Sequence, residues 1–100
     1  MAFEIVVDGH NYYFRGPVRP HELPKASGVY MVMGDGGRPV YIGEAGNIHA
    51  RVTGGHEKER CWKQHGSGQS IRYVLIRHWQ VRKKVERRAI EKWNPICNRS

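Results

Sequence analysis

Two short apolar runs separated by a glycine-rich turn constrain the fold of this chain more than any other feature. Residues 29–33 and 39–42 are rich in side chains that suit a pleated strand, and residues 34–37, Gly-Asp-Gly-Gly, supply the left-handed positions that a tight loop needs. The pattern predicts an antiparallel β-hairpin. Because residues two apart share a face, Tyr30 and Tyr41 are expected within reach of each other on neighbouring strands. The alternative is that both are ordinary strand aromatics.

Length and charge limit the classes of protein that this chain can belong to. One hundred residues suit a single domain with one core. No run approaches the roughly 18 apolar residues of a membrane span, so we expect a soluble, cytoplasmic protein without a membrane partner. The formal net charge of +8 favours a polyanionic partner, of which nucleic acid is the usual one. A basic surface that only confers solubility is the alternative.

The two cysteines, Cys61 and Cys97, are expected to be unpaired. A single disulfide is uncommon in a chain without a secretion signal. His56, Cys61 and His65 suggest a zinc site, but their spacing matches no common ligand pattern. A solvent-facing helix that carries two histidines explains them more simply.

The remaining segments predict a small α/β (α+β) fold. We expect a central three-stranded antiparallel sheet flanked by helices, with residues 1–27 as an N-terminal extension and residues 28–100 as the main domain. The extension comprises an accessory β-hairpin and a proline-rich connector that excludes helix and central strand. The other expected elements are a helix from Ile48 capped by Asn47, a second helix over 57–64, a third strand over 71–77 and a long helix over 80–93.

Glu86 is a carboxylate on the apolar side of the longest predicted helix. At about 100° per residue it falls within the arc of Val85, Ala89 and Trp93, whereas the other charged residues of this helix face solvent. A carboxylate that faces a core must be paired, protonated or bound to a metal. The alternatives for Glu86 are therefore a salt bridge, for instance to Arg82, and a functional role.

Taken together, these residues resemble the GIY-YIG nuclease family, which includes homing endonucleases, some restriction enzymes and the excision-repair nuclease subunit that cuts damaged DNA. Gly28-Val29-Tyr30 is similar to the first triplet of the family, with Val in place of Ile, and Tyr41-Ile42-Gly43 is similar to the second. The residues that follow in the order and spacing of the family are Arg51, Glu86, Pro95 and Asn98. The resemblance covers roughly residues 27–98.

The resemblance implies metal-dependent hydrolysis of DNA, with a role for each matched residue. Tyr30 is expected to act as general base or to orient the attacking water, and Tyr41 to position the scissile phosphate or its water. Arg51 is expected to stabilise charge in the transition state, because its fork of donors matches phosphate oxygens. Glu86 is expected to hold one divalent ion, Mg²⁺ or Mn²⁺. Asn98 is expected to hold the C-terminal segment against the site.

Two positions depart from the pattern of the family. A histidine or tyrosine often stands four residues after the arginine, where this chain has Gly55. His56 is our candidate for supporting Tyr30, and His49 and His65 are the alternatives. The excision-repair branch has a lysine after the second triplet, where this chain has Glu44. We interpret Glu44 as a solvated residue, with a second metal contact as the alternative.

The expected partner is DNA, double-stranded or branched. Lys83, Lys84 and Arg87 on the outer face of the long helix are candidates for phosphate contacts, together with Arg51. A domain of this size has little surface for reading sequence, so strong specificity would need a homodimer, a partner protein or recognition of DNA shape. The alternative functions are a catalytically weak nucleic-acid-binding module and a subunit of a larger nuclease complex that docks through its N-terminal hairpin.

Overall fold

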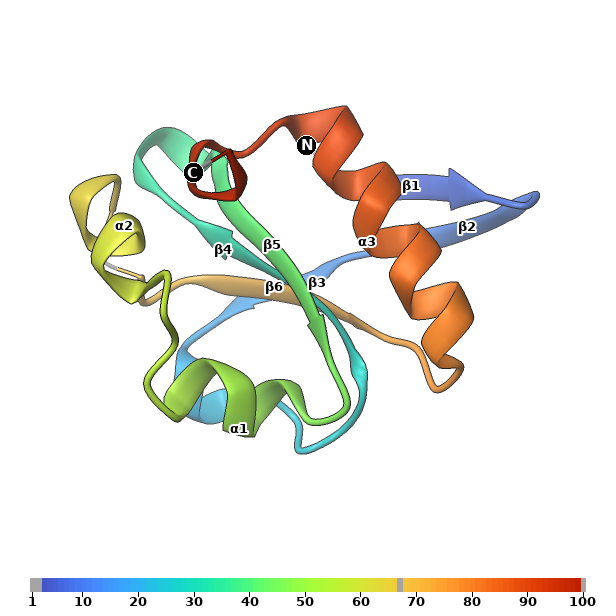
Figure 1. Ribbon diagram of the computed structural model, residues 1–100, viewed down its shortest axis with the longest axis horizontal. Coiled ribbons are helices and arrows are strands. Elements are labelled where there is room, and N and C mark those ends of the chain that lie inside the picture. Colours follow the sequence, from blue (N-terminus) through green and yellow to red (C-terminus); the bar gives the residue numbers. More distant parts are fainter. Residues whose placement is uncertain (1–2, 67, 100) are drawn as a thin grey trace.

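A four-stranded antiparallel sheet forms the centre of the molecule (Figure 1). The structure is a computed structural model that describes residues 3–66 and 68–99. The strands lie in the order β3 (Arg15–Val18), β6 (Ile71–Leu75), β4 (Gly28–Met33) and β5 (Pro39–Ala45), and a separate two-stranded sheet pairs β1 (Glu4–Val7) with β2 (His10–Tyr13). The hairpin and the third strand expected from the sequence are therefore present, as β4, β5 and β6.

Among the described residues, three α-helices and three short 3-10 turns surround the sheet. Asn47 caps the first helix as expected, since its side-chain oxygen accepts the Ala50 N–H at 3.0 Å. The longest helix ends at Asn94, which adopts the left-handed conformation that often terminates a helix. The elements are α1 (Ile48–Thr53), α2 (Glu59–Gln64), α3 (Trp79–Trp93), η1 (Pro20–Glu22), η2 (Asp35–Gly37) and η3 (Ile96–Asn98).

Two hydrophobic cores lie on opposite faces of the sheet, and β4 contributes to both. All six residues of β4 are buried. Val29 and Met31 pack in a core with Val85 and Ala89 of α3. Tyr30 belongs to the other core, which contains residues of α1, α2 and η3. Alternation along one buried strand therefore sends the tyrosine to the face that α3 does not cover.

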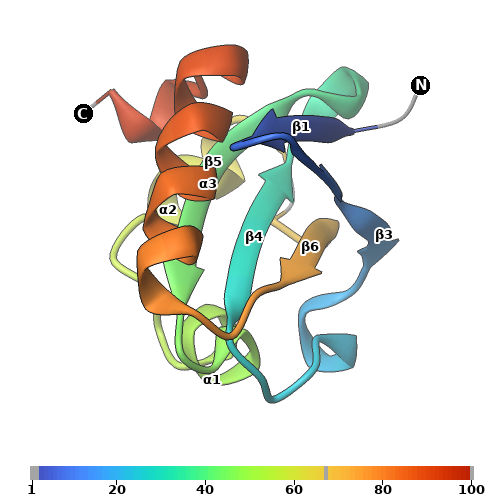
Figure 2. The same ribbon diagram turned by 90° about the vertical axis from the view of Figure 1, so that its right-hand side faces the viewer.

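The N-terminal hairpin is part of the first core, so its interpretation as an accessory ribbon was wrong. Ile5 and Val7 of β1 are buried with the residues under α3, and so is Phe14. In both views β1 lies beside α3 (Figures 1 and 2). Lys92 donates a hydrogen bond to the Glu4 carbonyl at 2.8 Å and adds a polar contact between them. The sequence pattern could not show which surface the hairpin would cover.

The proline-rich connector takes part in the structure more than we expected. Its first residues form β3, which pairs with β6 at the edge of the sheet and makes the sheet four-stranded rather than three-stranded. Pro17 is accommodated there because an edge strand needs to donate hydrogen bonds on only one side. The connector also contains a short helical segment, η1, although the prolines predicted that it would contain no helix. Pro20 is its first residue, a position whose N–H has no hydrogen-bond partner within a helix.

Cys61 and Cys97 form a disulfide, which corrects the expectation that both are unpaired. Cys61 lies on α2 and Cys97 on η3, and their Cα atoms are 5.9 Å apart, well within the range that a disulfide spans. The prediction rested on the usual cellular compartment, and it took no account of how close the fold brings these two segments. The disulfide also removes Cys61 from the zinc site considered above.

None of the helices in the described part of the chain is both long enough and apolar enough to cross a bilayer.

We predict that reduction of the disulfide lowers the free energy of unfolding by about 2–4 kcal/mol, because the bond closes a long loop and restricts the unfolded chain. The sequence separation of the two cysteines is 36. Urea unfolding of the wild type with and without dithiothreitol measures the effect. The double variant Cys61→Ala and Cys97→Ala is the control and should not respond to the reductant. Identical wild-type curves under both conditions would contradict the prediction.

Candidate active site

The two triplet tyrosines meet on the face of the sheet opposite α3. In the β4–β5 register, Tyr30 pairs with Gly43 and Val32 pairs with Tyr41, so both tyrosines project from the same face. Their ring centroids are 6.1 Å apart. Tyr30 is only 1% exposed, whereas Tyr41 is half-buried and closer to the surface. The sequence prediction that the two tyrosines lie within reach of each other is confirmed.

Gly43 is required by this arrangement because Tyr30 lies directly over it. A Cβ atom at residue 43 would come within 2.5 Å of the Tyr30 hydroxyl oxygen and within 3.0 Å of the Tyr41 ring. A Cβ at Gly28 would similarly meet the Val74 carbonyl oxygen at 2.3 Å. The glycine of each triplet therefore allows a close approach, by a tyrosine in one case and by the neighbouring strand in the other.

His56 is the candidate histidine that the fold brings against Tyr30. Its Nε2 lies 2.7 Å from the Tyr30 hydroxyl, and its side chain is fully buried. The backbone N–H of Lys58 donates to His56 Nδ1 at 3.0 Å, so Nδ1 must carry a lone pair. In the neutral ring the proton is then on Nε2, and His56 donates to the Tyr30 oxygen. One backbone amide thereby determines the tautomer of the histidine.

Tyr41 lies between Tyr30 and the surface, because Tyr30 is buried and Tyr41 is half-buried. The interaction between the two hydroxyls raises the pKa of Tyr30 and lowers that of Tyr41. The Lys58 N–H donates to His56, His56 donates to Tyr30, and Tyr41 lies beside Tyr30 with its ring centroid 6.1 Å away. Tyr41 is therefore the tyrosine nearer to solvent.

Burial keeps these groups neutral at ordinary pH. Desolvation is the main cause that raises the pKa of Tyr30, and it raises the pKa of Tyr41 as well. Desolvation and the positive charge of Arg51 lower the pKa of His56 to about 4. The charge of Arg51 also lowers the pKa of both tyrosines and so opposes the effect of burial on them. Arg51 is thus close enough to favour a phenolate.

Arg51 is held by a residue that the sequence analysis did not single out. Its Nη2 donates to both carboxylate oxygens of Glu57, at 2.6 and 2.7 Å. This hydrogen bond is the main cause that lowers the pKa of Glu57 to about 2. Both side chains are exposed enough that the pair contributes little net stability, so a phosphate can compete with Glu57 for the guanidinium. No local sequence pattern predicts this pair, which depends on the loop after α1.

Glu86 has no ion-pair partner within the part of the chain that the structure describes. Arg82, the partner considered from the sequence, instead donates to Glu44 at 2.7 Å, and Lys83 lies 3.2 Å from the same carboxylate. Burial raises the pKa of Glu86, and the nearby Glu44 raises it further. Its negative charge reaches both tyrosines and raises the pKa of each.

The interpretation of Glu44 as a solvated residue was wrong. Its side chain is only 15% exposed and lies against Arg82 and Lys83. Burial raises the pKa of Glu44, but the two cations outweigh it and the pKa is lowered overall. By binding Arg82, Glu44 removes the cation that could have neutralised Glu86. The sequence did not reveal which glutamate pairs with Arg82, because both Glu44 and Glu86 carry a suitable charge. The choice depends on how the end of β5 packs against α3.

The donors around Glu86 suit a hard divalent cation with water in most of its coordination positions. A half-buried carboxylate without a cation partner is an oxygen ligand of the kind that Mg²⁺ prefers. Within residues 3–66 and 68–99, no group of three or more histidine, cysteine, aspartate or glutamate side chains forms a complete metal cage. The site therefore fits Mg²⁺, which usually binds through one or two carboxylates and retains waters. It does not fit a structural zinc site.

Asn98 lies at the edge of β5 and does not contact the tyrosine pair. Its side-chain amide accepts the Ile42 N–H at 2.8 Å and donates to the Ile42 carbonyl at 2.9 Å. This double hydrogen bond completes the edge of the sheet beside Tyr41. The geometry is consistent with the predicted task of holding the C-terminal segment, to which the Cys97 disulfide also contributes.

The three cations proposed for phosphate contacts are all exposed on α3, as the helical wheel predicts. Two of them already form ion pairs, Lys83 with Glu44 and Lys84 with Asp8 at 3.1 Å. Arg87 has no ion pair with the described residues. The contact of these side chains with DNA stays a prediction.

No family model matches the sequence, and no curated protein matches it. Solved structures with a similar fold include the GIY-YIG N-terminal endonuclease domain of UvrC from Thermotoga maritima, bound to magnesium as its catalytic divalent cation. That structure has a TM-score of 0.62 and 20% sequence identity, and the match covers 78% of this chain and 89% of that chain.

Other solved forms of the same UvrC domain match to the same degree. One is a point mutant bound to its catalytic divalent cation, with a TM-score of 0.62 and 20% identity over 78% of this chain and 88% of that chain. A second point mutant has a TM-score of 0.61 and 18% identity over the same shares. The chain therefore has the fold of a GIY-YIG nuclease domain, and the expected fold class is confirmed.

We predict that His56 makes the folded state sensitive to mild acid. Its pKa is lowered from 6.5 to about 4, so its contribution to stability is present above about pH 6.5 and is lost as the pH falls toward 4. The loss is on the order of 3 kcal/mol. Urea unfolding across this window should show a steeper decline for the wild type than for His56→Gln. Parallel pH dependences would show that His56 does not titrate in this way.

Proposed function

We propose that this protein is a metal-dependent endonuclease that hydrolyses phosphodiester bonds of DNA. The observation that carries the proposal is the half-buried Glu86 carboxylate, which lacks an ion-pair partner among the described residues and whose charge acts on both tyrosines. Arg82 pairs with Glu44 and not with Glu86. A partly buried carboxylate without an ion pair is more readily explained by binding of a cation than by a structural role. The GIY-YIG fold, shared with a magnesium-bound nuclease domain, supports the same conclusion.

Glu86 is the residue that would hold one divalent ion, Mg²⁺ or Mn²⁺. The ion supplies charge stabilisation at the non-bridging phosphate oxygens and favours ionisation of water. The backbone N–H of Glu44 donates a hydrogen bond to the Glu86 carboxylate, and this bond lowers the pKa of Glu86 against the effect of burial. Bound positive charge would further favour the ionised carboxylate. A second contact through Glu44 is not needed, since Arg82 and Lys83 already pair with it.

The two tyrosines act as a hydrogen-bonded pair in this proposal. Tyr41 is nearer the surface, so its hydroxyl oxygen can accept a hydrogen bond from the attacking water, or its O–H can donate one to the scissile phosphate. Tyr30 lies behind it, and as a neutral phenol it would orient the water through Tyr41. To act as base, Tyr30 must first lose its own proton to solvent, which the nearby charge of Arg51 favours. His56 donates to Tyr30 and so stabilises negative charge on that oxygen. The neutral state of His56 keeps this donor in place across the physiological range.

Arg51 stabilises the negative charge that develops on the phosphate. Glu57 engages only its Nη2, so Nε and Nη1 are not hydrogen-bonded within the described residues and can face a phosphate. The hydrogen bond to Glu57 also raises the pKa of Arg51, which keeps the guanidinium charged at any pH of interest.

The substrate in this proposal is double-stranded or branched DNA, attracted by the net charge of +8. A homodimer, a partner protein and a cytoplasmic location stay predictions from the sequence.

We predict that the wild type nicks supercoiled plasmid with Mg²⁺ or Mn²⁺ and not with EDTA, and that Glu86→Ala abolishes the nicking. The physical reason is the loss of the carboxylate that, among the described residues, is proposed to hold the ion. Agarose gels of the relaxed product measure the rate. Glu91→Ala is the matched control, because Glu91 is an exposed glutamate on the same helix. If the wild type cleaves neither duplex, branched nor single-stranded DNA with either metal, the proposed function is wrong.

We predict that Arg51→Ala lowers kcat by about 10²–10³, the usual effect of removing one donor that stabilises transition-state charge. Arg51→Lys should recover only part of this loss, because lysine keeps the charge but not the fork. Single-turnover nicking separates this effect from weaker DNA binding. Arg60→Ala, at an exposed arginine of α2, is the control and should cleave like the wild type. Equal rates for Arg51→Ala and the control would exclude the assigned role.

A further inference from the structure

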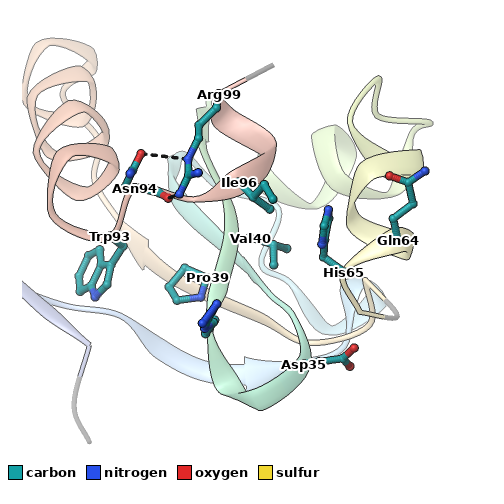
Figure 3. A pocket seen from close by; sticks show the side chains of 10 residues that line it. Asp35, Pro39, Val40, Gln64, His65, Trp93, Asn94, Ile96 and Arg99 are labelled. Atoms are coloured by element: carbon teal, nitrogen blue, oxygen red, sulfur yellow. Dashed lines mark hydrogen bonds between the residues drawn. The ribbon is translucent and has the colours of Figure 1, made fainter.

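We propose that a pocket beside the C-terminal turn binds one unpaired nucleotide of the DNA strand that is cut. The pocket lies between η3, the end of α2, the β4–β5 turn and the end of α3 (Figure 3). It is separate from the residues described as the candidate active site, none of which lines it. The inference rests on the proposed nuclease function and adds a substrate class to it.

The size and lining of the pocket suit a nucleotide. Its volume is about 610 Å³, within the range of sites that bind small molecules. Pro39, Ile96 and part of the Trp93 side chain supply apolar surface for a base or sugar, and Figure 3 shows these side chains around the opening. Gln64 and Asn94 add amide groups that can hydrogen-bond to a base. A mixed apolar and amide lining is the kind that accepts a nucleobase.

Two arginines place positive charge at the same opening. Arg38 and Arg99 both line the pocket, and neither forms an ion pair with the residues that the structure describes. Arg99 is held in place by Asn94, since its Nη2 donates to the Asn94 carbonyl at 2.9 Å. Among the described residues of the lining, Asp35 is the one carboxylate, so their formal charge is positive. Guanidinium groups bind phosphate well, which favours an anionic nucleotide over a neutral ligand.

The position of the pocket relates it to the proposed site of cleavage. Val40 lines the pocket, and the next residue along β5 is Tyr41. From Pro39 to Tyr41 the strand advances about 7 Å, which corresponds to about two nucleotides of a stacked single strand. The turn η3 lines the pocket through Ile96 and is tied to the edge of β5 by the Asn98–Ile42 hydrogen bonds and to α2 by the Cys97 disulfide. A DNA strand that passes over η3 would therefore reach both.

The concave shape of the pocket selects an unpaired nucleotide. A nucleobase enters such a site only when it is separated from its partner strand, and the cost of unpairing is smallest where the base is already single-stranded. We therefore infer that DNA with unpaired nucleotides next to the cut is preferred over fully paired duplex.

The test measures binding without cleavage. Fluorescence anisotropy of a labelled single-stranded oligothymidylate, and of a blunt duplex of the same length, is recorded in EDTA for each variant. Arg38→Glu and Ile96→Glu change the pocket at exposed positions. Arg15→Glu is the matched control, because Arg15 is an exposed arginine on β3, at the opposite edge of the sheet. Thermal unfolding of each variant confirms that it folds.

We expect Arg38→Glu and Ile96→Glu to weaken binding of the single strand about tenfold more than Arg15→Glu does, and to weaken duplex binding no more than that control. Titration of the oligothymidylate should also shift the indole N–H signal of Trp93 in NMR spectra, while that of the distant and exposed Trp79 stays in place. Equal losses for all three variants, or a stationary Trp93 signal with bound oligonucleotide, would overturn the proposal. Because no metal is present, these outcomes are independent of whether the protein nicks plasmid.

Discussion

The pairing of β4 with β5 is the interaction on which the rest of the structure depends. β4 is buried on both faces, and its register against β5 places Tyr30 over Gly43 and next to Tyr41. A shift of one residue would move every side chain of β4 to the opposite face and send Tyr30 into the core under α3. The two hydrophobic cores and the candidate active site are therefore set by the same register.

Around this strand pair, polar groups are arranged so that charge is available only where the proposed chemistry uses it. Tyr30, Tyr41 and His56 are neutral, and a single backbone amide, that of Lys58, sets the direction of the hydrogen bond between His56 and Tyr30. Arg82 pairs with Glu44, and Glu86 has no ion pair among the described residues. Both effects arise from short contacts between residues that the fold brings together.

Much of the fold and part of the site could be predicted from local patterns. The glycine-rich turn between two apolar runs predicted the hairpin, and the helical wheel predicted that Glu86 faces inward from α3. The N-terminal hairpin was predicted as an element but not as part of the core, since periodicity identifies an apolar face without showing what covers it. The disulfide was missed for a similar reason, because α2 and η3 are brought together only by the folded sheet.

The sequence by itself placed two tyrosines on one face of a hairpin and a glutamate on an apolar helix face, because strand alternation and helical periodicity act over a few residues. The arginine in the next helix, and the grouping of these residues into one site, came from the resemblance of the sequence to the GIY-YIG family. Only the tertiary structure decided that Arg82 pairs with Glu44, that His56 supports Tyr30, and that Glu57 holds Arg51. Several partners of suitable charge were available to each group, and the distances that choose between them exist only after the sheet and helices have packed.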